Sequence, residues 1–70
     1  MAEFLKNNFR MVIKEIEDME FKNENIWVPI GILEYMFEDD IGYIDQYFHS
    51  KKEERNIDLL YLNLINRFNA

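Results

Sequence analysis

The side chains that could act as nucleophiles or bases are few and are poorly arranged for catalysis. The chain has one serine, Ser50, one histidine, His49, and no cysteine. Neighbours in sequence do not by themselves make a catalytic pair, because such pairs depend on geometry across the fold. Ser50 is followed three residues later by Glu53, which is the pattern of a helix capping box. The sequence therefore predicts a helix cap at Ser50, and a surface or helix-end position for His49.

The consecutive carboxylates Glu38, Asp39 and Asp40 are the other groups with chemical potential. Acid–base catalysis needs two carboxyl groups in environments that separate their pKa values, and we expect these three to be solvated. A calcium-binding loop of the EF-hand type needs oxygen ligands at alternate positions, where apolar or ring side chains stand after Asp39. One histidine and no cysteine also exclude a multi-ligand zinc site. We therefore predict a protein that is not an enzyme and has no metal or cofactor.

Apolar residues recur at helical spacing along most of the chain, which predicts an all-α fold. We expect residues 1–70 to form a single small domain, a compact bundle of three to four short helices. The first and last helices should be its principal packing pair, and Asp40 should cap the third. The expected helices are 3–19, 29–38, 41–48 and 51–68, with an extended segment at 26–28 before Pro29.

The expected core faces follow from the spacing of the apolar residues. The last helix carries apolar side chains over a wide arc, which suits the centre of a bundle or a subunit interface. A homodimer through the 51–68 helix is therefore one alternative for its role. The other stripes are Leu5, Phe9, Val12, Ile16 and Met19 in the first helix, Ile30, Leu33 and Phe37 in the second, and Ile41, Ile44 and Phe48 in the third.

The net charge of −6 is concentrated in the middle of the chain. Residues 15–45 carry ten acids and one base, whereas the flanking segments are slightly basic. Such a protein is repelled by nucleic-acid backbones and by anionic membranes, so we expect it to bind neither directly. A larger protein with a basic surface would be attracted. The absence of cysteine and of a membrane-length apolar run favours a soluble, cytoplasmic protein.

Aromatic residues are dense within the same acidic block, and tyrosines are common anchors of protein interfaces. The leading hypothesis is a non-catalytic protein-binding module, acting as an inhibitor, adaptor or regulator through a central acidic–aromatic surface. The main alternative is an acidic nucleic-acid mimic that blocks a DNA- or RNA-handling enzyme, and a third is a structural homo-oligomer subunit. The predicted protein-binding residues are Glu34, Tyr35, Glu38, Asp39, Asp40, Tyr43, Asp45 and Tyr47.

Overall fold

The chain folds as α-helices linked by short turns, as the spacing of its apolar residues predicts. A computed structural model describes the backbone of residues 2–69 and the side chains of residues 5–66. Within this range there are four α-helices and no strand, so the predicted all-α class is confirmed. The elements are α1 (Ala2–Phe21), α2 (Trp27–Met36), α3 (Tyr43–His49), the single 3-10 turn η1 (Lys52–Glu54) and α4 (Ile57–Asn69).

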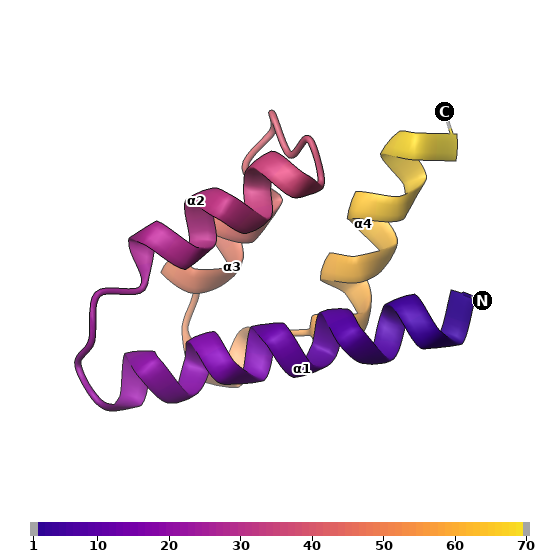
Figure 1. The fold of residues 1–70 in the computed structure, drawn as a ribbon. Coiled ribbons are helices and arrows are strands. Elements are labelled where there is room, and N and C mark those ends of the chain that lie inside the picture. The colour runs from indigo at the N-terminus through magenta and orange to yellow at the C-terminus, as the bar shows by residue number, and fades with distance from the viewer. Residues whose placement is uncertain (1, 70) are drawn as a thin grey trace.

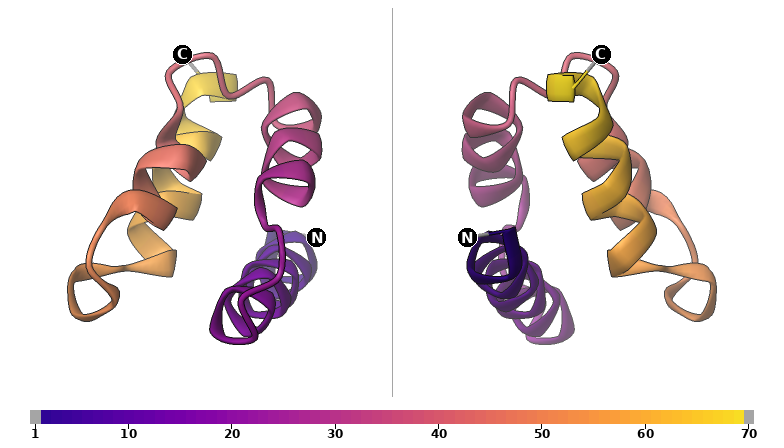
Figure 2. Two further views of the ribbon diagram at one scale, coloured as in Figure 1. Left: turned by 90° about the vertical axis from the view of Figure 1, so that its left-hand side faces the viewer. Right: turned by 90° about the vertical axis from the view of Figure 1, so that its right-hand side faces the viewer.

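The helices form two layers (Figures 1 and 2). α1 and α2 lie one above the other in the first layer, and α3 and α4 form the second layer beside them. α4 packs against both α1 and α3, and α2 packs against α3. The expected contact between the first and last helices is therefore present. It is not the principal one, because α4 packs against α3 as well.

The core lies between the two layers, and every α-helix contributes to it. In α1 the most buried residue is Ile13, whereas Leu5 and Val12 of the predicted stripe are exposed. The face toward the second layer is thus rotated from the predicted one, because α1 must contact α4 as well as the α2–α3 side. The buried apolar residues are Phe9, Ile13, Ile16, Ile26, Ile30, Leu33, Ile44, Tyr47, Phe48, Leu60, Tyr61 and Leu64.

The turn between α1 and α2 contains one correction to the sequence prediction. Asn23 adopts the left-handed conformation (φ 61°) in the turn that ends α1. Trp27 and Val28 are helical instead of extended. Ile26 and Ile30 are both buried, and the Ile30 N–H donates to the Ile26 carbonyl at 3.1 Å. This buried turn overcomes the bias against helix before Pro29, whose missing N–H costs nothing in a first turn.

The turn between α2 and α3 breaks near Asp39 as predicted, but Asp39 and not Asp40 is the capping residue. The Asp39 Oδ1 accepts hydrogen bonds from the N–H groups of Gly42 and Tyr43, each at 3.0 Å. Its Oδ2 accepts a third from the Ile44 N–H at 2.9 Å. Asp39 is only 7% exposed, so this carboxylate satisfies buried donors at the start of α3.

The connection between α3 and α4 shows that the predicted capping box at Ser50 is wrong. The Ser50 hydroxyl donates back to the Gln46 carbonyl at 2.7 Å and so belongs to the end of α3. The 3-10 turn η1 and then Arg55 and Asn56 follow before α4 begins at Ile57. Asn56 caps α4 instead, because its Oδ1 accepts the Leu59 N–H at 3.1 Å.

Replacing the capping carboxylate should destabilise the whole fold. In an Asp39→Asn variant the amide nitrogen would face a backbone donor, so we expect a loss of about 2 kcal/mol in the free energy of unfolding. Urea unfolding followed by circular dichroism measures this loss. Asp58→Asn is the control, because Asp58 is an exposed carboxylate and should cost less than about 0.5 kcal/mol. Equal losses in the two variants would contradict the capping role.

Candidate functional site

The eight residues predicted to bind a protein do not form one surface. Five of them, Glu34, Tyr35, Glu38, Asp39 and Asp40, line a shallow hollow with Met36 at the C-terminal end of α2. Of the three from α3, Asp45 lies close to Glu34 and so adjoins this hollow, whereas Tyr43 and Tyr47 face residues of the α3–α4 connection and α4. The structure therefore supports an acidic edge at the end of α2, which we define as Glu34, Glu38 and Asp40.

Tyr47 was expected on the surface, but the structure buries it to 7% exposure. Ile41, expected in the core, precedes α3 and is exposed, so Tyr47 joins Ile44 and Phe48 on the inward face. Its hydroxyl donates to Glu17 Oε2 at 3.2 Å. Burial raises the pKa of Tyr47 well above its usual value, and the neighbouring Glu17 carboxylate adds to the effect. Neither Tyr47 nor the capping Asp39 is available to a partner in this conformation.

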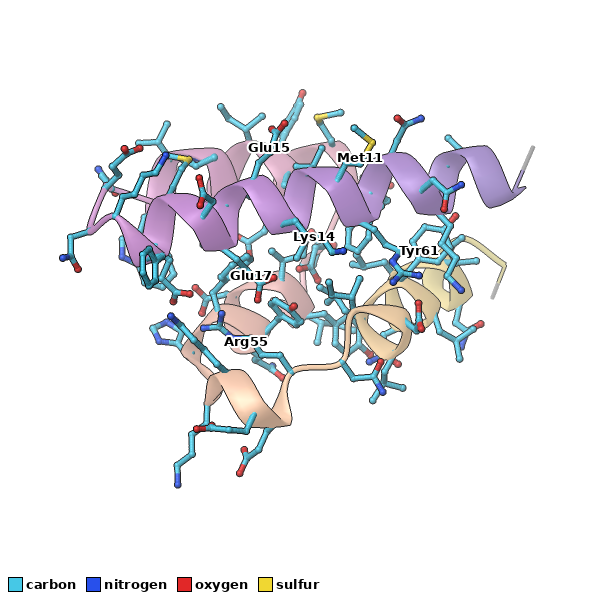
Figure 3. The ribbon with its side chains drawn as sticks, turned by 90° about the horizontal axis from the view of Figure 1, so that it is seen from below. Met11, Lys14, Glu15, Glu17, Arg55 and Tyr61 are labelled. Atoms are coloured by element: carbon cyan, nitrogen blue, oxygen red, sulfur yellow. The ribbon has the colours of Figure 1, made fainter. Side chains whose placement is uncertain are left out.

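Arg55 is the centre of a buried polar cluster that the sequence did not reveal. Its side chain is 4% exposed and lies between α1 and α3, where Figure 3 shows it beside Glu17. Nη1 donates to Glu17 at 3.2 Å and to Glu20 at 2.8 Å, and Nη2 donates to Glu20 and to the Phe48 carbonyl, each at 3.0 Å. The guanidinium also lies over the ring of Phe48. Every one of these contacts is internal, so the cluster is structural.

The acidic edge contains two local costs. Burial raises the pKa of Glu34 above its ordinary value, and the carboxylates of Asp39 and Asp45 raise it further. Glu38 adopts the left-handed conformation (φ 51°) in the turn that ends α2, a position that favours glycine. It also adds a negative charge at the end of a helix whose dipole is already negative there. The last turn of α2 itself contains no basic residue.

An apolar groove adjoins this edge and was not predicted from the sequence. It has a volume of about 320 Å³ and lies between the first half of α1, the second half of α2 and α4, which diverge at one side of the molecule in Figure 1. Met36 lines both the groove and the acidic hollow, which makes the two continuous. Among the residues whose side chains the structure describes, its lining is Asn8 together with Leu5, Phe9, Val12, Leu33, Met36, Phe37, Tyr61 and Ile65.

The outer face of α2 extends the same apolar surface. Val28, Gly31, Ile32 and Tyr35 share one side of this helix by their spacing, and we call them the α2 outer face. Val28 is 62% exposed, Ile32 58% and Tyr35 85%. Glu34 is the one charged residue of the ten in α2. In the sequence, α2 is apolar on almost every side, and a helix of this kind is usually covered by other parts of a structure. This pattern could have indicated the apolar surface.

Many other carboxylates of the acidic block are satisfied within the molecule. Glu17 and Glu20 bind Arg55, Asp18 pairs with Lys22 at 3.1 Å, and Asp39 is a cap. Hydrogen bonds from Arg55 lower the pKa of Glu20, which stabilises its ionised form. The negative surface left for a partner is thus smaller than the sequence count indicates.

The groups first considered for chemistry have structural partners. The His49 ring stacks on Trp27 with centroids 4.9 Å apart, and its Nε2 lies 3.5 Å from Asp45. Ser50 bonds to α3 as described above. Among the residues that the structure describes, no group of acidic or histidine side chains is arranged to hold a metal ion. None of the described helices has the length and apolar character needed to cross a membrane.

Comparison of the chain with protein-family models, curated proteins and solved structures found no match. The groove, the α2 outer face and the acidic edge are therefore the features of the molecule that bear on its function.

The Arg55 cluster predicts an acid-sensitive stability. The folded-state pKa of Glu20 lies below its value of 4.5 in an unfolded chain, so its contribution is complete above pH 4.5. It is lost as the pH falls through the lowered pKa. In Arg55→Met we expect a loss of about 2 kcal/mol at neutral pH and a flatter decline of unfolding free energy in acid. Lys22→Met, which removes an exposed cation, should keep the wild-type pH slope, and the same slope in all three proteins would contradict this role.

The buried hydroxyl of Tyr47 predicts an alkaline limit to stability. Because the folded-state pKa is raised above the unfolded value of 10.0, the neutral phenol favours the fold below this pH, and the benefit is lost as the pH rises further. Tyr47→Phe should therefore leave the absorbance change at 295 nm of the native protein unaltered. In urea it should remove one of four titrating phenols. A smaller native titration in the variant would show that Tyr47 is accessible.

Proposed function

We propose that the protein is a non-catalytic protein-binding module that takes an apolar helical segment of a larger partner. The observation that carries this proposal is the continuous apolar surface formed by the groove and the α2 outer face, joined through Met36. In the predicted hypothesis the acidic–aromatic residues were the contact surface. In the present proposal they lie at the rim of the apolar surface instead. Those that remain on or near the surface are Glu34, Tyr35, Glu38 and Asp40.

The shape of this surface favours a protein segment over a small ligand. Grooves between diverging helices commonly receive the apolar face of an amphipathic helix. α2 exposes large side chains beyond the groove itself, so a small molecule in the groove would leave Val28, Ile32 and Tyr35 in water. Contiguous apolar patches of this kind mark interaction sites in soluble proteins. An inhibitor, adaptor or regulator suits such a module, and the lack of cysteine suits a cytoplasmic location.

The two alternative functions receive less support from the geometry. A nucleic-acid mimic needs regularly spaced negative charge on its surface. The carboxylates of Glu17, Glu20 and Asp39 are instead engaged in contacts within the molecule. A homo-oligomer through the last helix would cover Leu59 and Leu62, which are both exposed on α4. It would leave the larger apolar surface at α2 uncovered, and the net charge of −6 opposes self-association.

A matched pair of substitutions tests which apolar surface binds the partner. Ile32→Glu places a charge on the α2 outer face, and Leu62→Glu places one on α4 at a similar exposure, 58% against 53%. Tagged wild-type and variant proteins are used to capture proteins from an extract of the producing cells, followed by quantitative mass spectrometry. We expect partners to be lost by at least about tenfold with Ile32→Glu and retained with Leu62→Glu.

Circular dichroism and thermal unfolding of both variants control for folding. A partner that depends on Leu62 but not on Ile32 would move the site to α4. Equal capture by all three proteins would contradict binding through either helix.

A further inference from the structure

We propose that the occupant of the α2 outer face is a basic amphipathic helix, which crosses α2 closely at Gly31 and places cationic side chains on the acidic edge. This proposal rests on the protein-binding function above and names the chemistry of the partner. Three local features of α2 each cost stability in the isolated chain, and each is accounted for by such a helix.

Gly31 is the first of these features. It lies within α2, where glycine is less favourable for helix stability than alanine. A Cβ built at this position meets nothing within 4 Å, so the fold of the chain does not require glycine. Val28, Ile32 and Tyr35 surround it on the same face. A missing side chain within an exposed apolar face lets the backbone of a second helix approach closely.

Glu38 is the second feature. Its φ of 51° belongs to a conformation that glycine or asparagine adopts with less strain. The turn holds it there, because the Asp39 N–H donates to the Glu34 carbonyl at 2.8 Å and the Glu38 N–H to the Tyr35 carbonyl at 3.2 Å. Glycine would close this turn better, whereas glutamate adds an exposed carboxylate. Glutamate at position 38 is therefore well suited to binding a cation and poorly suited to the backbone conformation of the turn.

Glu34 is the third feature, since it is half-buried against the carboxylates of Asp39 and Asp45. A lysine or arginine from outside would relieve this repulsion. Residues 23–48 contain six acids and no lysine or arginine, so this part of the chain is strongly acidic. The edge and the negative end of the α2 dipole therefore act together on a partner's cations.

A second copy of this chain is a poorer occupant of the same face. Two copies in contact through α2 would bring together two sets of Glu34, Glu38 and Asp40, with no cation of α2 to compensate. Like charges that face each other across an interface oppose binding, whereas opposite charges steer association. Charge complementarity thus selects a basic helix.

The test uses two labelled synthetic peptides of twenty residues with the same leucine–alanine face. One carries lysine at all other positions and the other carries glutamate. Fluorescence anisotropy with the full chain measures affinity at low and high salt. We expect the lysine peptide to bind at least about tenfold more tightly than the glutamate peptide, with a preference that weakens in salt.

Four variants separate the α2 site from general attraction to an acidic protein. Gly31→Ala should raise the melting temperature by about 4 °C and still weaken the lysine peptide about tenfold, because the added methyl blocks close approach. Glu38→Gln should weaken it about threefold. The matched controls Leu62→Ala, which truncates an apolar side chain on α4, and Glu53→Gln, which removes one exposed charge from η1, should leave the affinity unchanged.

Equal effects of Glu38→Gln and Glu53→Gln, with none from Gly31→Ala, would show long-range attraction only and overturn the proposal. A wild-type dimer that Gly31→Ala dissociates, seen by analytical ultracentrifugation, would assign the face to a second copy and also overturn it. Equal binding of the two peptides, beside Ile32-dependent capture of a cellular partner, would refute the basic helix while the protein-binding function stands. Loss of that capture dependence would instead refute the proposed function.

Discussion

The guanidinium of Arg55 fixes the relation between the two layers of the bundle. It draws Glu17 and Glu20 of α1 onto the Phe48 carbonyl and ring of α3, so one buried cation joins helices that are distant in sequence. Burying a cation is costly unless anions and hydrogen bonds surround it, and here two carboxylates and a carbonyl do so. The bonds fix η1 against α1 and set the point from which α4 departs. The positions of α4 and of the groove wall it forms depend on this contact.

The same arrangement explains why apolar surface is left open at the opposite side. A chain of 70 residues cannot bury all of its apolar side chains, because its surface is large relative to its core. Arg55 closes the C-terminal half of α1 against α3, whereas the N-terminal half, the end of α2 and α4 diverge around the apolar groove. The exposed face of α2 lies next to this opening. The Arg55 contacts with Glu17, Glu20 and Phe48 include no residue of the proposed binding surface, so changes at Ile32 or Gly31 should leave them intact.

The sequence predicted what depends on local spacing and missed what depends on packing between helices. The all-α class, the number of helices and the break near Asp39 follow from helical periodicity and turn chemistry. The Ser50 cap was wrong because the Ser50 hydroxyl bonds back to the Gln46 carbonyl at the end of α3, and Asn56 caps α4 instead. Tyr47 entered the core because Ile41 lies outside α3, and Arg55 was overlooked because its partners lie 35 and 38 residues away. Helical spacing relates residues that are three or four positions apart, so it cannot connect groups this distant in the sequence.

In the proposed function, a helix from another protein covers the apolar surface of α2. Methyl-labelled NMR measures this most directly, by titration of the protein with the lysine peptide and, once identified, with the captured partner. The account predicts the largest shift changes at the methyl groups of Val28, Ile32 and Met36, while those of Leu59 and Leu62 on α4 stay in place. Shift changes centred on Leu59 and Leu62, with α2 unaffected, would contradict it.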